Sequence, residues 1–152
     1  MRKAVMPFVL SLALIAVWVA PADAASTRAE YAAQADPTCR SADQDTTHLW
    51  KRFLRLNKVS KSKGATNALR SIKARIKSAN RELSLITPPP GDEALIGEWI
   101  GIWDQIATRW GFAALGYKLK LWSEVDNQFH KISRLGREAR RVVSGFPFQA
   151  CA

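Results

Sequence analysis

The chain has 152 residues, of which 47% are hydrophobic and 24% are charged, and its formal net charge at pH 7 is +10. This length favours one domain, and the composition excludes a disordered or low-complexity chain and predicts a packed core. The excess of positive charge favours polyanions as partners.

The first 24 residues are predicted to be a secretory signal peptide. Arg2 and Lys3 precede a mostly apolar run over 5–20, and Ala22-Asp23-Ala24 has the small-x-small pattern of a cleavage site. The apolar run is shorter than the ~20 residues that a spanning helix needs, and an uncleaved membrane anchor is the alternative. We therefore expect a secreted or extracytoplasmic protein, cleaved after about Ala24. Its single mature domain would cover residues 25–152 without a transmembrane helix.

Two helices are predicted in the first half of the mature chain. Residues 26–35 form either a short leading helix or an ordered arm. Asp36 and Pro37 are then typical of a helix start, and this first helix would extend to about Lys58. The second helix has apolar residues at alternating spacings of three and four, the pattern of a helix packed lengthwise against others. These residues are Leu69, Ile72, Ile76, Ala79, Leu83 and Ile86.

Two more helices are predicted after the prolines at 88–90. Asp92 would cap the third helix, which ends between Gly111 and Gly116, with Gly116 favoured. The fourth helix would run from about Tyr117 to Ser144, with Gly145 as its C-terminal cap.

Four helices of similar length with short connections favour an all-α, up-down-up-down four-helix bundle. Such a bundle brings the start of the first helix and the end of the fourth to the same end, where the two cysteines, Cys39 and Cys151, would meet. An even cysteine count in an exported protein predicts one disulfide, with free or intermolecular thiols as the alternative. Phe146 and Phe148 would cover this end of the core.

Several short motifs resemble those of a loose group of exported bacterial helical proteins of unknown function. They are Tyr31, the Ala-Asp-Pro-Thr-Cys segment at 35–39, the Pro-Pro-x-Gly-Asp break at 88–92 and the terminal Gly-Phe-x-Phe-x-x-Cys at 145–151. The resemblance covers most of the mature chain. It implies a small, secreted, disulfide-closed helical domain, and it implies no activity, ligand or catalytic residue.

Residues suited to catalysis are few. The only histidines, His48 and His130, lie three and four residues from Asp45 and Asp126, and two such ligands are fewer than a metal site needs. The chain has no zinc-protease, nucleophile-elbow or phosphate-loop motif. We expect a protein that is not an enzyme, with no catalytic residue, cofactor or metal.

Positive charge is concentrated in three of the four predicted helices. The candidate anion-binding residues are Lys51, Arg52, Arg55, Lys58, Arg70, Lys73, Lys77, Arg81, Arg134, Arg137 and Arg141. In an up-down-up-down bundle the first helix neighbours the second and the fourth, so the three basic helices would be contiguous. This arrangement predicts binding to an anionic cell-envelope polymer or to lipid headgroups; a merely solvated surface is the alternative. No motif for sequence-specific nucleic-acid binding accompanies the charge.

Tryptophans define a second candidate site. Trp50, Trp99, Trp103, Trp110 and Trp122 fall on predicted apolar faces and could enclose a small apolar ligand, although such residues also simply fill cores. The first functional hypothesis is therefore an anion-binding module, and the second is a carrier of an apolar ligand. Small residues at 97 and 101 permit self-association, but a monomer is expected rather than a dimer.

Overall fold

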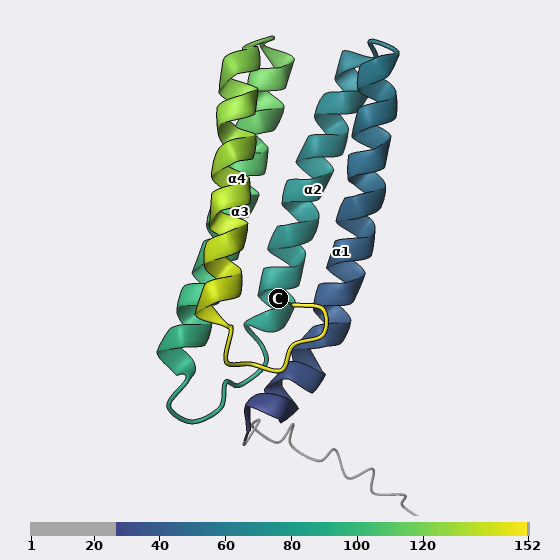
Figure 1. Ribbon diagram of the computed structural model, residues 1–152. Helices are drawn as coiled ribbons and strands as arrows, with labels where there is room; N and C mark the ends of the chain where they lie inside the picture. Colours follow the sequence, from purple (N-terminus) through teal and green to yellow (C-terminus); the bar gives the residue numbers. More distant parts are fainter. Residues whose placement is uncertain (1–26, 152) are drawn as a thin grey trace, which may run out of the picture.

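The computed structural model describes residues 27–151, which contain four α-helices. They are α1 (Arg28–Lys58), α2 (Ser62–Leu83), α3 (Glu93–Lys118) and α4 (Trp122–Val142). Successive helices run in opposite directions and form an elongated bundle (Figure 1). The predicted all-α four-helix bundle is confirmed, whereas the predicted signal peptide lies outside the described residues. No helix within residues 27–151 is long and apolar enough to cross a bilayer.

The first helix begins before the Asp36-Pro37 pair, so the predicted helix start at this pair is wrong. Thr27 caps α1 instead: its hydroxyl accepts a hydrogen bond from the N–H of Glu30, and the Glu30 carboxylate accepts one from the N–H of Thr27. Pro37 lies inside α1, where it cannot donate to the carbonyl of Ala33. Ala33 is exposed, so water can satisfy that carbonyl.

The boundary between the last two helices also differs from the prediction. α3 continues through Gly116, and Tyr117 belongs to α3 rather than to α4. Gly116 is buried, and a Cβ at this position would lie 3.2 Å from Cγ2 of Val125 in α4. The glycine therefore permits close packing instead of ending the helix. Gly145 does not cap α4, because the cap position is Val143.

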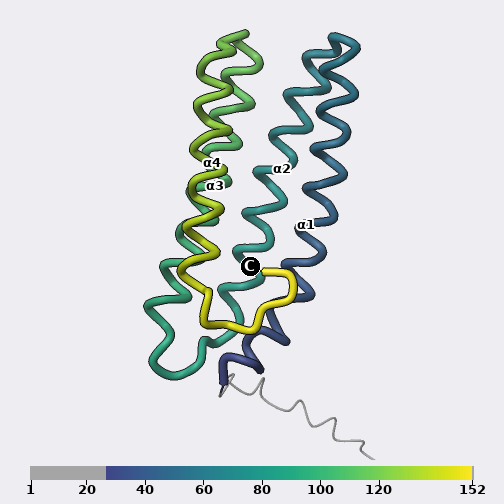
Figure 2. Tube along the Cα trace, in the orientation of Figure 1, coloured from purple at the N-terminus to yellow at the C-terminus, as the bar shows by residue number. Residues whose placement is uncertain are grey.

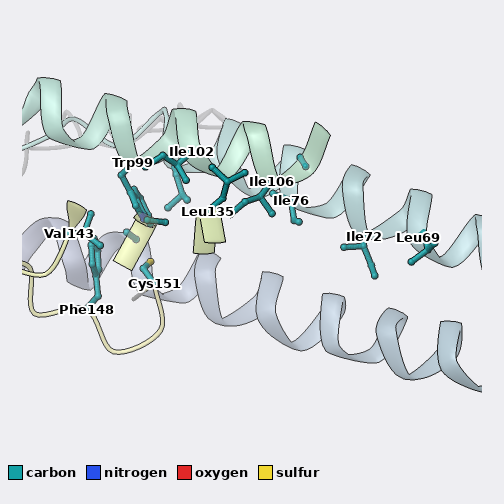
Figure 3. Packing of buried hydrophobic residues seen from close by; sticks show 14 of the residues in the cluster. Leu69, Ile72, Ile76, Trp99, Ile102, Ile106, Leu135, Val143, Phe148 and Cys151 are labelled. Atoms are coloured by element: carbon teal, nitrogen blue, oxygen red, sulfur yellow. The ribbon is translucent and has the colours of Figure 1, made fainter. Parts of the chain in front are cut away.

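Each helix packs against the next one in sequence. α1 packs on α2, α2 on α3 and α3 on α4, but the backbones of α1 and α4 do not approach each other closely. The core follows this series of contacts, and the predicted seam of α2 supplies Leu69, Ile72 and Ile76 to it (Figure 3). The first helix was expected to neighbour the fourth, but the two do not pack along their length: the rings of Trp50 and Phe129 meet, and the rest of the edge between the backbones is open.

The tail, residues 143–151, joins α4 to α1 at one end of the bundle (Figure 2). The predicted disulfide between Cys39 and Cys151 is present, with an S–S distance of 2.01 Å and a sequence separation of 112. Asp36 provides a second attachment. Its carboxylate accepts hydrogen bonds from three consecutive backbone N–H groups, those of residues 149–151, at 2.8, 2.9 and 3.2 Å.

Aromatic rings fill the space beneath this attachment. Tyr31 of α1 meets Phe146 and Phe148 of the tail edge-on, with ring centroids 6.0 and 6.2 Å away. Phe148 also stacks on Trp99 of α3 at 5.4 Å (Figure 3). Both phenylalanines are buried, so the prediction that they cover this end of the core is confirmed.

Arg28 connects the start of α1 to the start of α3. Its guanidinium donates two hydrogen bonds to the carboxylate of Asp92, at 2.7 and 2.8 Å, and lies 4.9 Å from the ring centre of Phe146. These hydrogen bonds lower the pKa of the Asp92 carboxyl. Asp92 occupies the predicted N-cap position, but its side chain makes no capping hydrogen bond, because Arg28 engages it instead.

We expect Asp36→Ala to destabilise the tail end of the bundle. The change leaves three backbone N–H groups without their acceptor, and a buried unsatisfied donor costs about 1–3 kcal/mol. Since part of the tail is exposed, we expect the free energy of unfolding to fall by roughly 2–4 kcal/mol in urea denaturation with the disulfide intact. Asp43→Ala removes an exposed carboxylate from the same helix and is the matched control. Equal stability of the two variants would contradict the role given to Asp36.

We expect Tyr31→Phe to change the response to alkaline pH. Tyr31 is fully buried, its hydroxyl has no hydrogen-bond partner among the described residues, and burial raises its pKa to about 12. The folded-state pKa thus exceeds the unfolded value of about 10, so the folded protein favours the neutral phenol. The stability that depends on this neutral form is fully present below pH ~10 and is lost as the pH rises toward ~12. Near neutral pH, the melting temperature of the variant should equal or exceed that of the wild type. As the pH rises through this alkaline window, the melting temperature of the variant should fall less than that of the wild type. Parallel declines of both proteins across the window would refute the expectation.

Candidate functional site

A cavity of about 730 Å³ follows the open edge between α1 and α4. At one end the rings of Trp50 in α1 and Phe129 in α4 meet, with centroids 5.5 Å apart. At the other end lie the disulfide and the tail, and α2 and α3 form the floor. We call this cavity the groove.

Five segments line the groove, and most of its floor is apolar. The lining residues are Cys39, Ala42, Asp43, Thr46, Thr47 and Trp50 in α1, Ile72, Ile76, Ala79, Asn80 and Leu83 in α2, Trp99, Trp103, Ile106 and Trp110 in α3, Ile132, Ser133, Gly136, Arg137 and Arg140 in α4, and Ala150 and Cys151 in the tail. Within each helix most of them recur at spacings of three and four, so they share one face. The polar residues come mainly from α1 and α4, at the mouth.

The groove brings together four of the five tryptophans that were predicted to form a pocket. Trp99 is completely buried, whereas Trp50, Trp103 and Trp110 are only partly buried. Trp50 and Trp110 meet edge-on at 5.7 Å across α1 and α3. The predicted aromatic site therefore exists as a cavity wall rather than as a filled core.

Trp122 does not belong to the groove, and its predicted inward position is wrong. It is the first residue of α4, at the end of the bundle away from the disulfide, and is 53% exposed. Its ring lies edge-on to Tyr117 at 5.3 Å. The later start of α4 accounts for the difference, because Trp122 follows the turn directly.

Two indole N–H groups of the groove residues lack acceptors. The Nε1 atoms of Trp99 and Trp103 are buried and have no hydrogen-bond partner among the described residues. An unsatisfied buried donor is unfavourable by about 1–3 kcal/mol.

The mouth of the groove is bordered by small and polar residues. On α1 these include Ala42 and Thr46, and on α4 they include Gly136. A Cβ built on Gly136 would meet no atom within 4 Å, so the space beside it is empty. Arg137 and Arg140 are exposed on the α4 side of the mouth.

The predicted anion-binding residues do not form one surface over α1, α2 and α4. Lys51, Arg52, Arg55 and Lys58 are exposed on α1, and Arg134, Arg137 and Arg141 are exposed on α4. The first group lies in the half of α1 away from the disulfide, beyond Trp50, whereas the second lies in the half of α4 near the disulfide, so the two groups are separated along the bundle.

Two of the candidate anion-binding residues of α2, Lys73 and Lys77, lie toward α3. Lys77 pairs with Asp104 of α3 at 3.5 Å, and the side chain of Lys73 lies against Gly111 of α3. Arg70 and Arg81 are exposed. Because α2 packs between α1 and α3, Asp104 of α3 offsets part of the positive charge of the expected basic ridge.

The polar wall of the groove was missed in the sequence, although a signal for it exists. From Cys39 to His48 the chain contains no large apolar residue on any face. A helix that packs fully against its neighbours needs such residues every three or four positions. Their absence over this stretch indicates that α1 leaves space beside α2 and α4. Nothing in the sequence predicts that Arg140 lies at the mouth of the groove.

Metal ligands are not gathered at the groove or elsewhere in residues 27–151, where no group of three or more His, Cys, Asp or Glu side chains could hold an ion. The pairs Asp45 with His48 and Asp126 with His130 lie on exposed helix faces. Comparison with models of protein families, with curated proteins and with solved structures found no match for this chain.

Proposed function

We propose that this protein is a non-enzymatic carrier that holds a small apolar or amphipathic ligand in the groove. The observation that supports the proposal is the groove itself: a cavity of about 730 Å³, floored by α2 and α3 and lined by four tryptophans. Ligand pockets in proteins typically measure about 300–1,000 Å³ and combine apolar walls with a few polar groups. The groove has both properties.

The partial exposure of the tryptophans favours a ligand over simple core filling. Burying a large apolar side chain is favourable by about 1.5–3 kcal/mol, and Trp50, Trp103 and Trp110 forgo part of that gain. An apolar ligand in the groove would cover their exposed faces. Burial of these tryptophan faces would favour ligand binding, whereas a fully packed core would have no such apolar surface left to bury.

Export is part of the proposal. The disulfide fits an oxidising, extracytoplasmic compartment, where such bonds form and persist. The proposal includes three predictions from the sequence: a signal peptide over residues 1–24, a monomeric state, and membership of the loose group of exported proteins. A carrier outside the cytoplasm would move apolar molecules through an aqueous space.

We expect Gly136→Phe to abolish ligand binding without unfolding the protein. The new ring has room, because nothing lies within 4 Å of a Cβ at this position, and it would occupy the mouth of the groove. Native mass spectrometry of protein purified from its source should show added mass for the wild type and none for the variant. The neutral fluorescent probe N-phenyl-1-naphthylamine should bind the variant at least ~10-fold more weakly, equivalent to about 1.4 kcal/mol.

The matched control is Gly97→Phe, which places the same ring on an equally open helical glycine outside the groove. It should bind the probe as the wild type does. If both variants bind equally well, or if the wild type carries no added mass and takes up no probe, the carrier function is wrong.

An anionic polymer or surface is the second candidate partner. Lys51, Arg52, Arg55 and Lys58 are exposed, and none of them takes part in an ion pair between described residues. Fixed charge without internal partners remains available to a polyanion.

We expect reversal of Lys51, Arg52 and Arg55 to glutamate to lower the salt concentration that elutes the protein from an anionic matrix. The control reverses Arg134, Arg137 and Arg141, which changes the net charge by the same amount. A larger shift for the α1 variant would locate the binding surface on α1. Equal shifts would mean that the matrix senses only net charge, and this candidate would fail.

A further inference from the structure

Two similar turns lie at the same end of the bundle, opposite the disulfide (Figure 1). One joins α1 to α2 through residues 59–61, and the other joins α3 to α4 through residues 119–121. In each, the middle residue has a positive φ, 55° at Ser60 and 59° at Lys120. In each, the third residue donates its N–H to the carbonyl five positions earlier, as in the Schellman motif. We call this region the two-turn end.

Large apolar side chains project from the two-turn end. Val59, Leu119, Leu121 and Trp122 are each more than half exposed, and Leu115 lies one helical turn below Leu119. They belong to both turns and to the adjoining ends of α3 and α4. Clustered exposed apolar residues of this size commonly mark an interaction surface.

The same end is positively charged. Residues 46–81 and 105–123, which include both turns, contain no aspartate or glutamate. The lysines near the turns are all exposed: Lys58, Lys61, Lys63, Lys118 and Lys120. The nearest carboxylate in sequence, Glu124, accepts hydrogen bonds from Asn127 and Gln128.

A buried platform supports one of these side chains, Trp122. The ring of Trp122 packs edge-on against Tyr117, which packs edge-on against Phe53 of α1, both with centroids 5.3 Å apart. The Tyr117 hydroxyl donates a hydrogen bond to Oδ1 of Asn57 at 2.7 Å, which joins the ends of α3 and α1. The Trp122 ring is therefore held in place before any partner arrives, which lowers the entropic cost of binding.

We infer that the two-turn end docks on an anionic lipid bilayer. Tryptophan favours the level of the lipid headgroups, leucine and valine favour the acyl boundary, and lysines are attracted by anionic lipids. A soluble polyanion would match the lysines but would leave the four apolar side chains in water. This surface lies outside the groove, and its role does not depend on the carrier function.

The test is co-sedimentation of the exported protein, with its disulfide intact, with phosphatidylcholine vesicles that contain or lack phosphatidylglycerol. We expect binding to the anionic vesicles and little to the zwitterionic ones. Replacing Leu119, Leu121 and Trp122 with serine should weaken binding by at least ~10-fold, because the inserted apolar area is lost. Replacing Lys61, Lys63 and Lys118 with glutamine should weaken it by about 100-fold, from the usual contribution of each lysine near an anionic surface.

Matched controls come from the opposite end of the bundle. Leu85 is 85% exposed there, and Leu85→Ser should leave binding unchanged. Glutamine at Arg40, Arg81 and Arg141 removes the same charge as the lysine variant and should have a much smaller effect. Circular dichroism would establish that each variant is folded.

Trp122 provides a direct measurement of insertion. It is the only tryptophan among residues 27–151 that is more than half exposed, so brominated lipids should quench wild-type fluorescence more than that of Trp122→Phe. The inference is overturned if the serine variant binds anionic vesicles as the wild type does, or if both vesicle types bind equally or not at all. Full competition by soluble polyphosphate, with no effect of the serine variant, would identify a polyanion site instead.

Discussion

The joint between α1 and the tail holds the two halves of the bundle in register. Among the described helices, α2 and α3 make the only close backbone contact between the α1–α2 and α3–α4 hairpins, so the α1–α4 edge lacks the continuous packing that would close it. The disulfide and the carboxylate of Asp36 close that edge at one end, and the contact of Trp50 with Phe129 closes it farther along. A covalent bond with three hydrogen bonds thus keeps the hairpins from separating while the groove between them stays open.

The sequence predicts most of the architecture, since its strongest signals are local. The alternating spacing from Leu69 to Leu83 specifies a buried seam, and two cysteines in an antiparallel bundle specify the closure. The errors occur where a tertiary contact overrides a local preference. Asp36 and Pro37 look like a helix start, yet the carboxylate binds the tail and the proline is accommodated within α1. Gly116 looks like a helix stop, yet it permits contact with Val125.

The candidate site was predictable in part, because helical spacing is a local signal. Helical spacing places Trp99, Trp103 and Trp110 on one face of α3, and this face does line the groove. Whether such a face meets other side chains or a cavity depends on the opposite helix, and α1 has only small and polar residues over 39–48. The same limit applies to the prediction of a charged surface. The basic residues of α2 can be identified from the sequence, but the proximity of Lys77 to Asp104 depends on how α2 and α3 pack.

The two ends of the bundle are chemically different, and this difference bears on how a carrier would work. At the disulfide end a rigid joint fixes the spacing between α1 and the tail, so the nearby mouth of the groove cannot widen freely. At the two-turn end the hairpins meet through Asn57, Phe53 and Tyr117 rather than through a covalent bond. Any separation of α1 from α4 is therefore easier toward the two-turn end. A protein that docks by that end would place the more deformable part of its groove nearer the bilayer, where an apolar ligand enters or leaves with the least exposure to water.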